Sequence, residues 1–60
     1  YHVSAVSSVE ITAGEVLSEK HIVYRNPGTG IPFKSIYKII GKKALKNIPS
    51  GKLLNLSMFA

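Results

Sequence analysis

Few side chains in this sequence could perform acid–base or nucleophilic chemistry. The candidates are two histidines, His2 and His21, and three glutamates, Glu10, Glu15 and Glu19; aspartate and cysteine are absent. Nucleophilic catalysis requires a nucleophile beside a base that a third group orients. Nothing in the spacing brings such a trio together, and the donors are too few for a metal cage. We therefore expect solvated glutamates, an ordinary packed or surface His21, and no catalytic or metal-binding residue.

A proline- and glycine-rich stretch carries stronger candidates for ligand binding. Residues 25–32 read Arg-Asn-Pro-Gly-Thr-Gly-Ile-Pro, which is typical of a loop. Its glycines lack the third glycine of a dinucleotide fingerprint and the Gly-Lys-Ser/Thr ending of a P-loop. Binding residues nevertheless concentrate on such loops, and arginine can make bidentate contacts. We predict ligand-contacting polar residues and a supporting loop backbone, namely Arg25, Asn26 and Thr29, and Pro27, Gly28 and Gly30. The alternative for Arg25 is a surface charge paired with Glu10 or Glu19.

The net charge of +5 is unevenly distributed. Residues 1–24 contain one lysine and all three glutamates, whereas residues 25–60 contain six lysines, one arginine and no acid. Such a field favours anionic partners, although a solvated lysine face is the plainer interpretation. Nucleic acid is not expected, because recognition modules usually interleave basic residues with stacking aromatics or several arginines.

The sequence shows no sign of a membrane or secretory segment. No run approaches the roughly 18 apolar residues of a membrane span, and no basic start precedes an apolar run. The absence of cysteine is compatible with a reducing compartment. We expect a cytoplasmic protein with no membrane partner.

Short elements are expected along the chain. Residues 3–11 and 22–24 favour strands, Gly14 suits a turn with a positive φ, and Ser18 suits the cap of one helical turn over 19–21. Residues 42–48 form a further strand candidate.

One amphipathic helix is expected after the loop. Phe33, Ile36, Tyr37 and Ile40 fall on one face of two helical turns. Pro32 suits the first helical position, and a glycine follows at position 41 to end the helix.

The most informative pattern is an internal repeat. Residues 11–22 match residues 48–59 at a constant offset of 37, each copy running from an apolar residue through a glycine turn to two apolar anchors. The anchors are Val16-Leu17 in the first copy and Leu53-Leu54 in the second. We predict two interlocked halves related by a pseudo-twofold axis, because neither half can cover its own apolar face.

Two further segments resemble a known family. Pro27-Gly28-Thr29-Gly30-Ile31, followed by Ile40-Gly41-Lys42-Lys43-Ala44, is similar to the antifreeze-like (SAF) domain that ends sialic acid synthases. The resemblance covers the whole chain, 1–60, as a single domain of a larger synthase. It implies a mostly β fold with short helical turns, the β-clip, with internal pseudo-twofold symmetry.

The resemblance also implies a function. In that family a (β/α)8 barrel condenses phosphoenolpyruvate with N-acetylmannosamine or a related sugar, using Mn or Mg, while the SAF domain has no cofactor or catalysis of its own. The domain covers the active site of the homodimer mate, and its arginine contacts the sugar. The family run Lys-Arg-Pro-Gly is replaced here by Tyr24-Arg25-Asn26-Pro27, so the contact falls to Arg25 or Asn26.

Two alternatives share the fold. Gly30-Ile31-Pro32 and Ile48-Pro49 also resemble fish type III antifreeze protein, but Glu15 and Lys43 would place charge where ice binding needs a neutral face. Pilus and flagellar assembly proteins carry SAF domains as a third, structural class.

Overall fold

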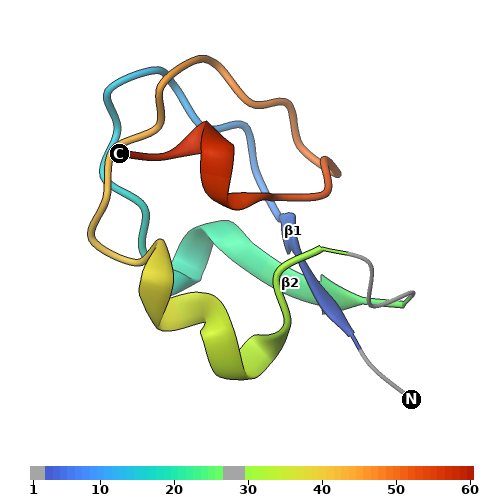
Figure 1. The fold of residues 1–60 in the computed structure, drawn as a ribbon. Helices are drawn as coiled ribbons and strands as arrows, with labels where there is room; N and C mark the ends of the chain where they lie inside the picture. Colours follow the sequence, from blue (N-terminus) through green and yellow to red (C-terminus); the bar gives the residue numbers. More distant parts are fainter. Residues whose placement is uncertain (1–2, 27–29) are drawn as a thin grey trace.

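A computed structural model of the chain describes residues 3–26 and 30–60. Strands β1 (Ser4–Ser7) and β2 (Ile22–Arg25) form a two-stranded antiparallel sheet. Short 3₁₀ helices punctuate the described residues: η1 (Glu19–His21), η2 (Phe33–Lys38) and η3 (Leu56–Met58). Figure 1 shows that the rest of the fold consists of extended segments wound closely around one another. The predicted fold class, a small β-clip-like domain with short helical turns, is confirmed.

The internal repeat is a real pseudo-twofold arrangement of the backbone. Ile11 and Ile48 form an antiparallel bridge, and each N–H donates to the other's carbonyl at 2.8 Å. Around this central pair, bridges recur at the offset of 37: Val6 with Leu53 matches Lys43 with Val16. The pairing of residues 7 and 22 in the sheet likewise matches the bridge between residues 44 and 59. The halves therefore interlock through the bridges around Ile11 and Ile48, as the repeat predicts, while the 7–22 and 44–59 pairings lie within each half.

The glycine turns of the two copies are also equivalent. Gly14 and Gly51 have φ values of +86° and +81°. The N–H of Gly14 donates to the carbonyl of Ala44 at 2.7 Å, and that of Gly51 donates to the carbonyl of Ser7 at 2.8 Å. Glycine adopts a left-handed conformation without the steric cost that other residues incur, which explains why both copies have glycine at this position.

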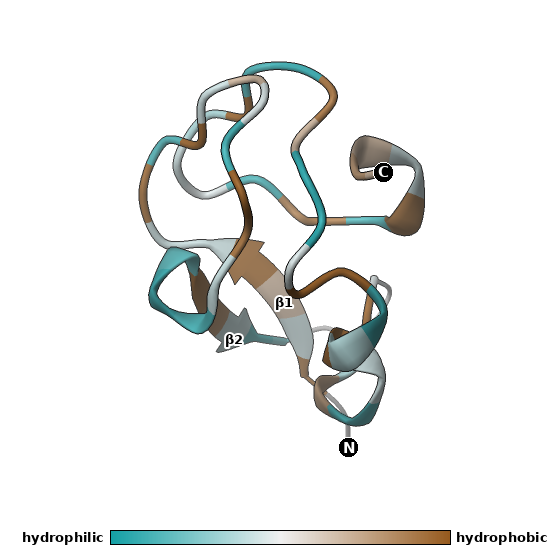
Figure 2. Ribbon diagram, turned by 90° about the vertical axis from the view of Figure 1, so that its left-hand side faces the viewer, coloured by the Kyte–Doolittle hydropathy of each residue, from teal (hydrophilic) through white to brown (hydrophobic). Residues whose placement is uncertain are grey.

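Both halves contribute apolar side chains to one core. Leu17 and Leu54, the second anchors of the two copies, are fully buried. The first anchors do not join the core, because Val16 and Leu53 are 49% and 38% exposed. Successive side chains of an extended backbone point to opposite sides, so only one of two neighbouring residues can face inward. Figure 2 shows this alternation of hydrophobic and hydrophilic residues along the extended segments.

The helix after the loop differs from the prediction. It is the 3₁₀ helix η2, whose bonds include Ile39 N–H to the Ile36 carbonyl at 3.0 Å. At the C-terminal end of this helix, Ile36 packs against the core and Ile39, the C-cap, lies within it, at the three-residue spacing of a 3₁₀ turn. Phe33 and Tyr37, predicted to face inward, are 64% and 71% exposed.

The ends of this helix are partly as predicted. Pro32 precedes η2 as its N-cap and is not its first helical residue. Gly41 follows the helical segment with a positive φ, as a helix-ending glycine should. Residues 42–48 form no strand; they pair through isolated bridges at Lys43, Ala44 and Ile48.

Candidate functional site

Ser4 of strand β1 anchors both ends of the predicted binding loop. Its register partner is Arg25, the last residue of β2, and it forms an isolated bridge with Pro32 on the far side of the loop. The buried Ser4 Oγ also accepts a hydrogen bond from the Gly30 N–H at 2.9 Å. One residue later, the Ala5 N–H donates to the Ile31 carbonyl at 2.9 Å. The start and end of the loop are therefore both fixed to β1.

Gly30 allows the returning chain to approach the second half of the molecule closely. A Cβ at this position would lie 3.0 Å from the carbonyl oxygen of Leu54 and 3.0 Å from side-chain atoms of Leu53. The Leu54 backbone is itself held by its N–H, which donates to the Ala5 carbonyl at 3.1 Å. Gly30 thus has a packing role in addition to its place in the loop.

Arg25 and Asn26 are exposed where the loop leaves β2. Arg25 makes no ion pair with Glu10 or Glu19 in the described part of the chain, where the one ion pair joins Glu15 and His21. Both residues are accordingly presented outward from the end of a strand. The other predicted site residues of the loop, Pro27, Gly28 and Thr29, lie outside the described residues.

A buried histidine forms a polar cluster that the sequence did not reveal. His21 is 3% exposed, and its Nδ1 accepts a hydrogen bond from the Ser18 N–H at 3.0 Å. Its Nε2 lies 3.1 Å from the Glu15 Oε2, and the Thr12 N–H donates to the Glu15 Oε1 at 2.9 Å. The hydrogen bond from Thr12, followed by that from His21, lowers the pKa of the Glu15 carboxyl.

The composition Ser-His-Glu invites comparison with a catalytic triad, but the geometry is structural. The Ser18 Oγ lies 3.3 Å from the His21 Nδ1, which already accepts the backbone N–H of the same serine. An imidazole nitrogen has one lone pair, so this one is not available to take the hydroxyl proton. The cluster instead ties the turn at Glu15 to η1. The spacing Ser18-x-x-His21, a capping-box pattern with histidine in the usual glutamate position, was the available signal.

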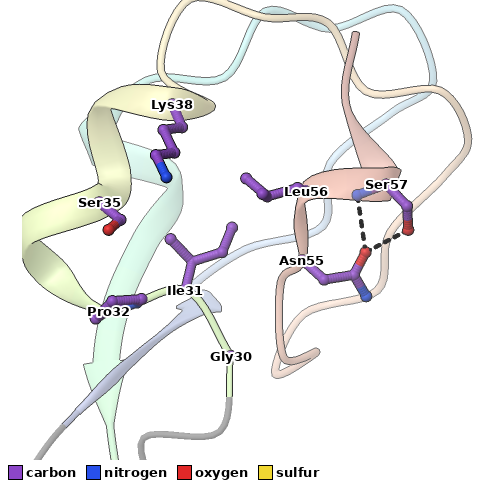
Figure 3. A pocket seen from close by; sticks show the side chains of 8 residues that line it. All are labelled: Gly30, Ile31, Pro32, Ser35, Lys38, Asn55, Leu56 and Ser57. Atoms are coloured by element: carbon purple, nitrogen blue, oxygen red, sulfur yellow. Dashed lines mark hydrogen bonds between the residues drawn. The ribbon is translucent and has the colours of Figure 1, made fainter.

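A cavity of about 490 Å³ opens beside the point where the loop returns. It lies between η2 and η3, and its lining residues are Gly30, Ile31, Pro32, Ser35, Lys38, Asn55, Leu56 and Ser57. Figure 3 shows Lys38 and Ser35 projecting from η2, opposite Leu56 of η3. Of these lining residues, only Gly30 was predicted from the sequence to belong to a binding site. The others could not be predicted, because the cavity depends on contacts between distant segments.

The described ranges contain neither a set of metal ligands nor a membrane-spanning helix. No group of three or more histidine, aspartate or glutamate side chains there could hold a metal ion. No helix within residues 3–26 and 30–60 is long and apolar enough to cross a membrane.

Comparison with known protein families shows to which family the chain belongs. A family model described as "SAF domain" matches residues 2–60. The chain belongs to the SAF domain family. A search of curated proteins returns no matching relative. The symmetry of this SAF domain, centred on the Ile11–Ile48 bridge, and the loop anchored at Ser4 are the structural features on which a functional proposal can build.

Proposed function

We propose that this SAF domain is the C-terminal, non-catalytic lid of a sialic acid synthase. The parent enzyme would condense phosphoenolpyruvate with N-acetylmannosamine or a related sugar in the cytoplasm. Its (β/α)8 barrel would hold the divalent metal, Mn or Mg, as the resemblance to that family implies. The domain would cover the sugar site of the homodimer mate.

One observation carries the proposal: Arg25 and Asn26 are exposed at the start of a loop whose two ends are fixed by Ser4. A side chain that leaves a strand end with no partner among the described residues is available for an external one. Its position is nevertheless defined, because Ser4 is buried and bonded on both sides of the loop. Binding to a preorganised group avoids part of the entropy cost of ordering it.

The chemistry of the two residues suits a sugar substrate. An N-acetylated sugar offers hydroxyls and an amide carbonyl, which are acceptors for a guanidinium or a side-chain amide. Closing such a lid would also exclude water from the barrel when both substrates are bound. The domain would therefore contribute positioning and exclusion of water, while bond formation takes place in the barrel.

Phosphate release by the parent enzyme tests the proposal. Deleting residues 1–60 should raise the KM for the sugar or abolish turnover. In the intact enzyme, Arg25→Ala or Asn26→Ala should raise the sugar KM, whereas Lys20→Ala, an exposed cation outside the loop, should not. An effect of Asn26→Ala alone would assign the sugar contact to the neutral amide. Unchanged KM and kcat after the deletion would refute the lid.

The mass of the native gene product is a simpler first measurement. A product large enough to add a barrel of about 250 residues before Tyr1 would support the synthase. A product near the 6.5 kDa of this chain would refute it and favour a free-standing antifreeze-like or adaptor protein.

A further inference from the structure

The cavity between η2 and η3 has the composition of a small-molecule site of its own. Its lining is divided between an apolar wall and a set of polar side chains, and its volume of about 490 Å³ is in the range of ligand pockets. We propose that it binds a small monocarboxylate with a compact apolar body, the carboxylate on Lys38 and the body against Ile31 and Leu56. The proposal does not depend on the parent enzyme, because every group it uses lies in this chain.

Charge in and around the cavity selects an anion. Lys38 has no ion-pair or hydrogen-bond partner in the described part of the chain, and none of the lining residues is acidic. In Figure 3 its ammonium extends from η2 into the space beside Ile31. A second cavity, which shares Lys38 and Leu56 with the first, adds Lys42 nearby. Because the described linings of both cavities contain no acidic side chain, the two lysines create a positive field that an anion would neutralise.

Hydrogen bonds among the lining residues occupy acceptors and leave mainly donors without a bond in the described part of the chain. The Asn55 Oδ1 accepts from both the N–H and the hydroxyl of Ser57. Its acceptor capacity is therefore used, and its amide nitrogen remains as a donor. The Lys38 ammonium and the Ser35 hydroxyl, which projects from η2 in Figure 3, can donate as well. An ionised carboxylate only accepts hydrogen bonds, and it matches this set.

The opposite wall suits a compact apolar group. Ile31 is buried and lies between η2 and η3 in Figure 3, whereas Leu56 is half exposed on η3. Covering an exposed leucine removes apolar surface from water and favours binding in proportion to that area. A carboxylate joined directly to a ring could contact Lys38 with its charge while its ring packs against Ile31 and Leu56.

Benzoate and its uncharged isostere benzamide test this directly on the 60-residue chain labelled with ¹⁵N. Benzoate should give saturable chemical-shift changes confined to the amides of Ile31, Ser35, Asn55, Leu56 and Ser57. Benzamide should bind at least about tenfold more weakly, because it cannot form the charge-assisted hydrogen bond to Lys38.

Two lysine variants separate a site from a general charge effect. Lys38→Met should weaken benzoate binding at least about tenfold, because the methionine keeps the stem and loses the charge. Lys34→Met removes an equivalent charge from the exposed side of η2, outside the cavity lining, and should leave binding unchanged. Unperturbed amide shifts at distant residues such as Ile11 would show that Lys38→Met is folded.

Three results would overturn the proposal: no saturable benzoate shifts, equal affinity for benzamide, or equal weakening by Lys34→Met and Lys38→Met. Equal weakening by the two lysine variants would show that benzoate responds only to the overall positive charge of residues 25–60.

Discussion

The central pair of isoleucines gives a quantitative test of the pseudo-twofold arrangement. Ile11 and Ile48 are both fully buried and bridge each other through two hydrogen bonds of 2.8 Å. Ile11→Val and Ile48→Val each delete one buried carbon, which removes about 0.8 kcal/mol of transfer free energy. Adding the incomplete collapse of the cavity, each variant should lower the free energy of unfolding by about 1 kcal/mol. Equivalent environments predict equal losses.

Thermal unfolding followed by circular dichroism can measure this loss. The entropy of unfolding is about 2.1 cal/mol/K per residue, or about 0.13 kcal/mol/K for this chain, so 1 kcal/mol corresponds to a fall in Tm of about 8 °C. Val9→Ala, at a valine that is 48% exposed, serves as the control and should change stability by less than about 0.5 kcal/mol.

Unequal effects would refute the reasoning. If one isoleucine variant lost about 1 kcal/mol while the other behaved like Val9→Ala, the two halves would share a backbone pattern without sharing its energetics. The double variant adds a second check, because residues in direct contact are expected to show non-additive losses.

Two other predictions concern the polar cluster and the loop. Gly30→Ala should destabilise the fold by about 1–3 kcal/mol in urea denaturation, because its Cβ would crowd the Leu54 carbonyl; a change below about 0.5 kcal/mol would show that the Leu54 backbone yields easily. Glu15 has a folded-state pKa below its ordinary value of 4.5, so its contribution to stability is present above that pH and is lost as pH falls through the lower folded value. As the pH is lowered, the Tm of Glu15→Gln should therefore fall less steeply than the Tm of wild type. Glu10→Gln, at an exposed glutamate, serves as the control and should follow wild type. Identical pH profiles for the two variants would contradict the role of Glu15.

The sequence predicted the fold where its signal was repeated. The offset of 37 aligns Ile11 with Ile48 and Gly14 with Gly51; in the structure the two isoleucines bridge each other and both glycines have a positive φ. Prediction failed where it depended on an assumed period. Ile39 was not assigned to the core because an α-helical period was assumed, whereas the helix is the 3₁₀ helix η2 and its C-cap, Ile39, is buried.

The candidate sites were harder to foresee because they depend on contacts between distant residues. His21 and Glu15 are six residues apart, a spacing that neither a helix nor a strand brings together by itself; the turn and η1 do so jointly. Lys38 and Asn55 meet around a cavity only because η3 packs beside the end of the loop. Arg25 could be selected from its residue type and loop context alone, and the structure places it exposed at a strand end.

The mutual pairing of the two halves has a consequence for how the chain folds. Because Ile11 bonds to Ile48, the central bridge closes a loop of about 37 residues, at an entropic cost of about 3 kcal/mol before further contacts compensate for it. Most pairings are of this distant kind, which predicts folding slower than that of a helical chain of the same length. During synthesis, β1 and β2 emerge together, but Val6, Ile11 and Val16 still lack the bridge partners that the second half supplies. The complete domain can therefore form only after the second half has been translated.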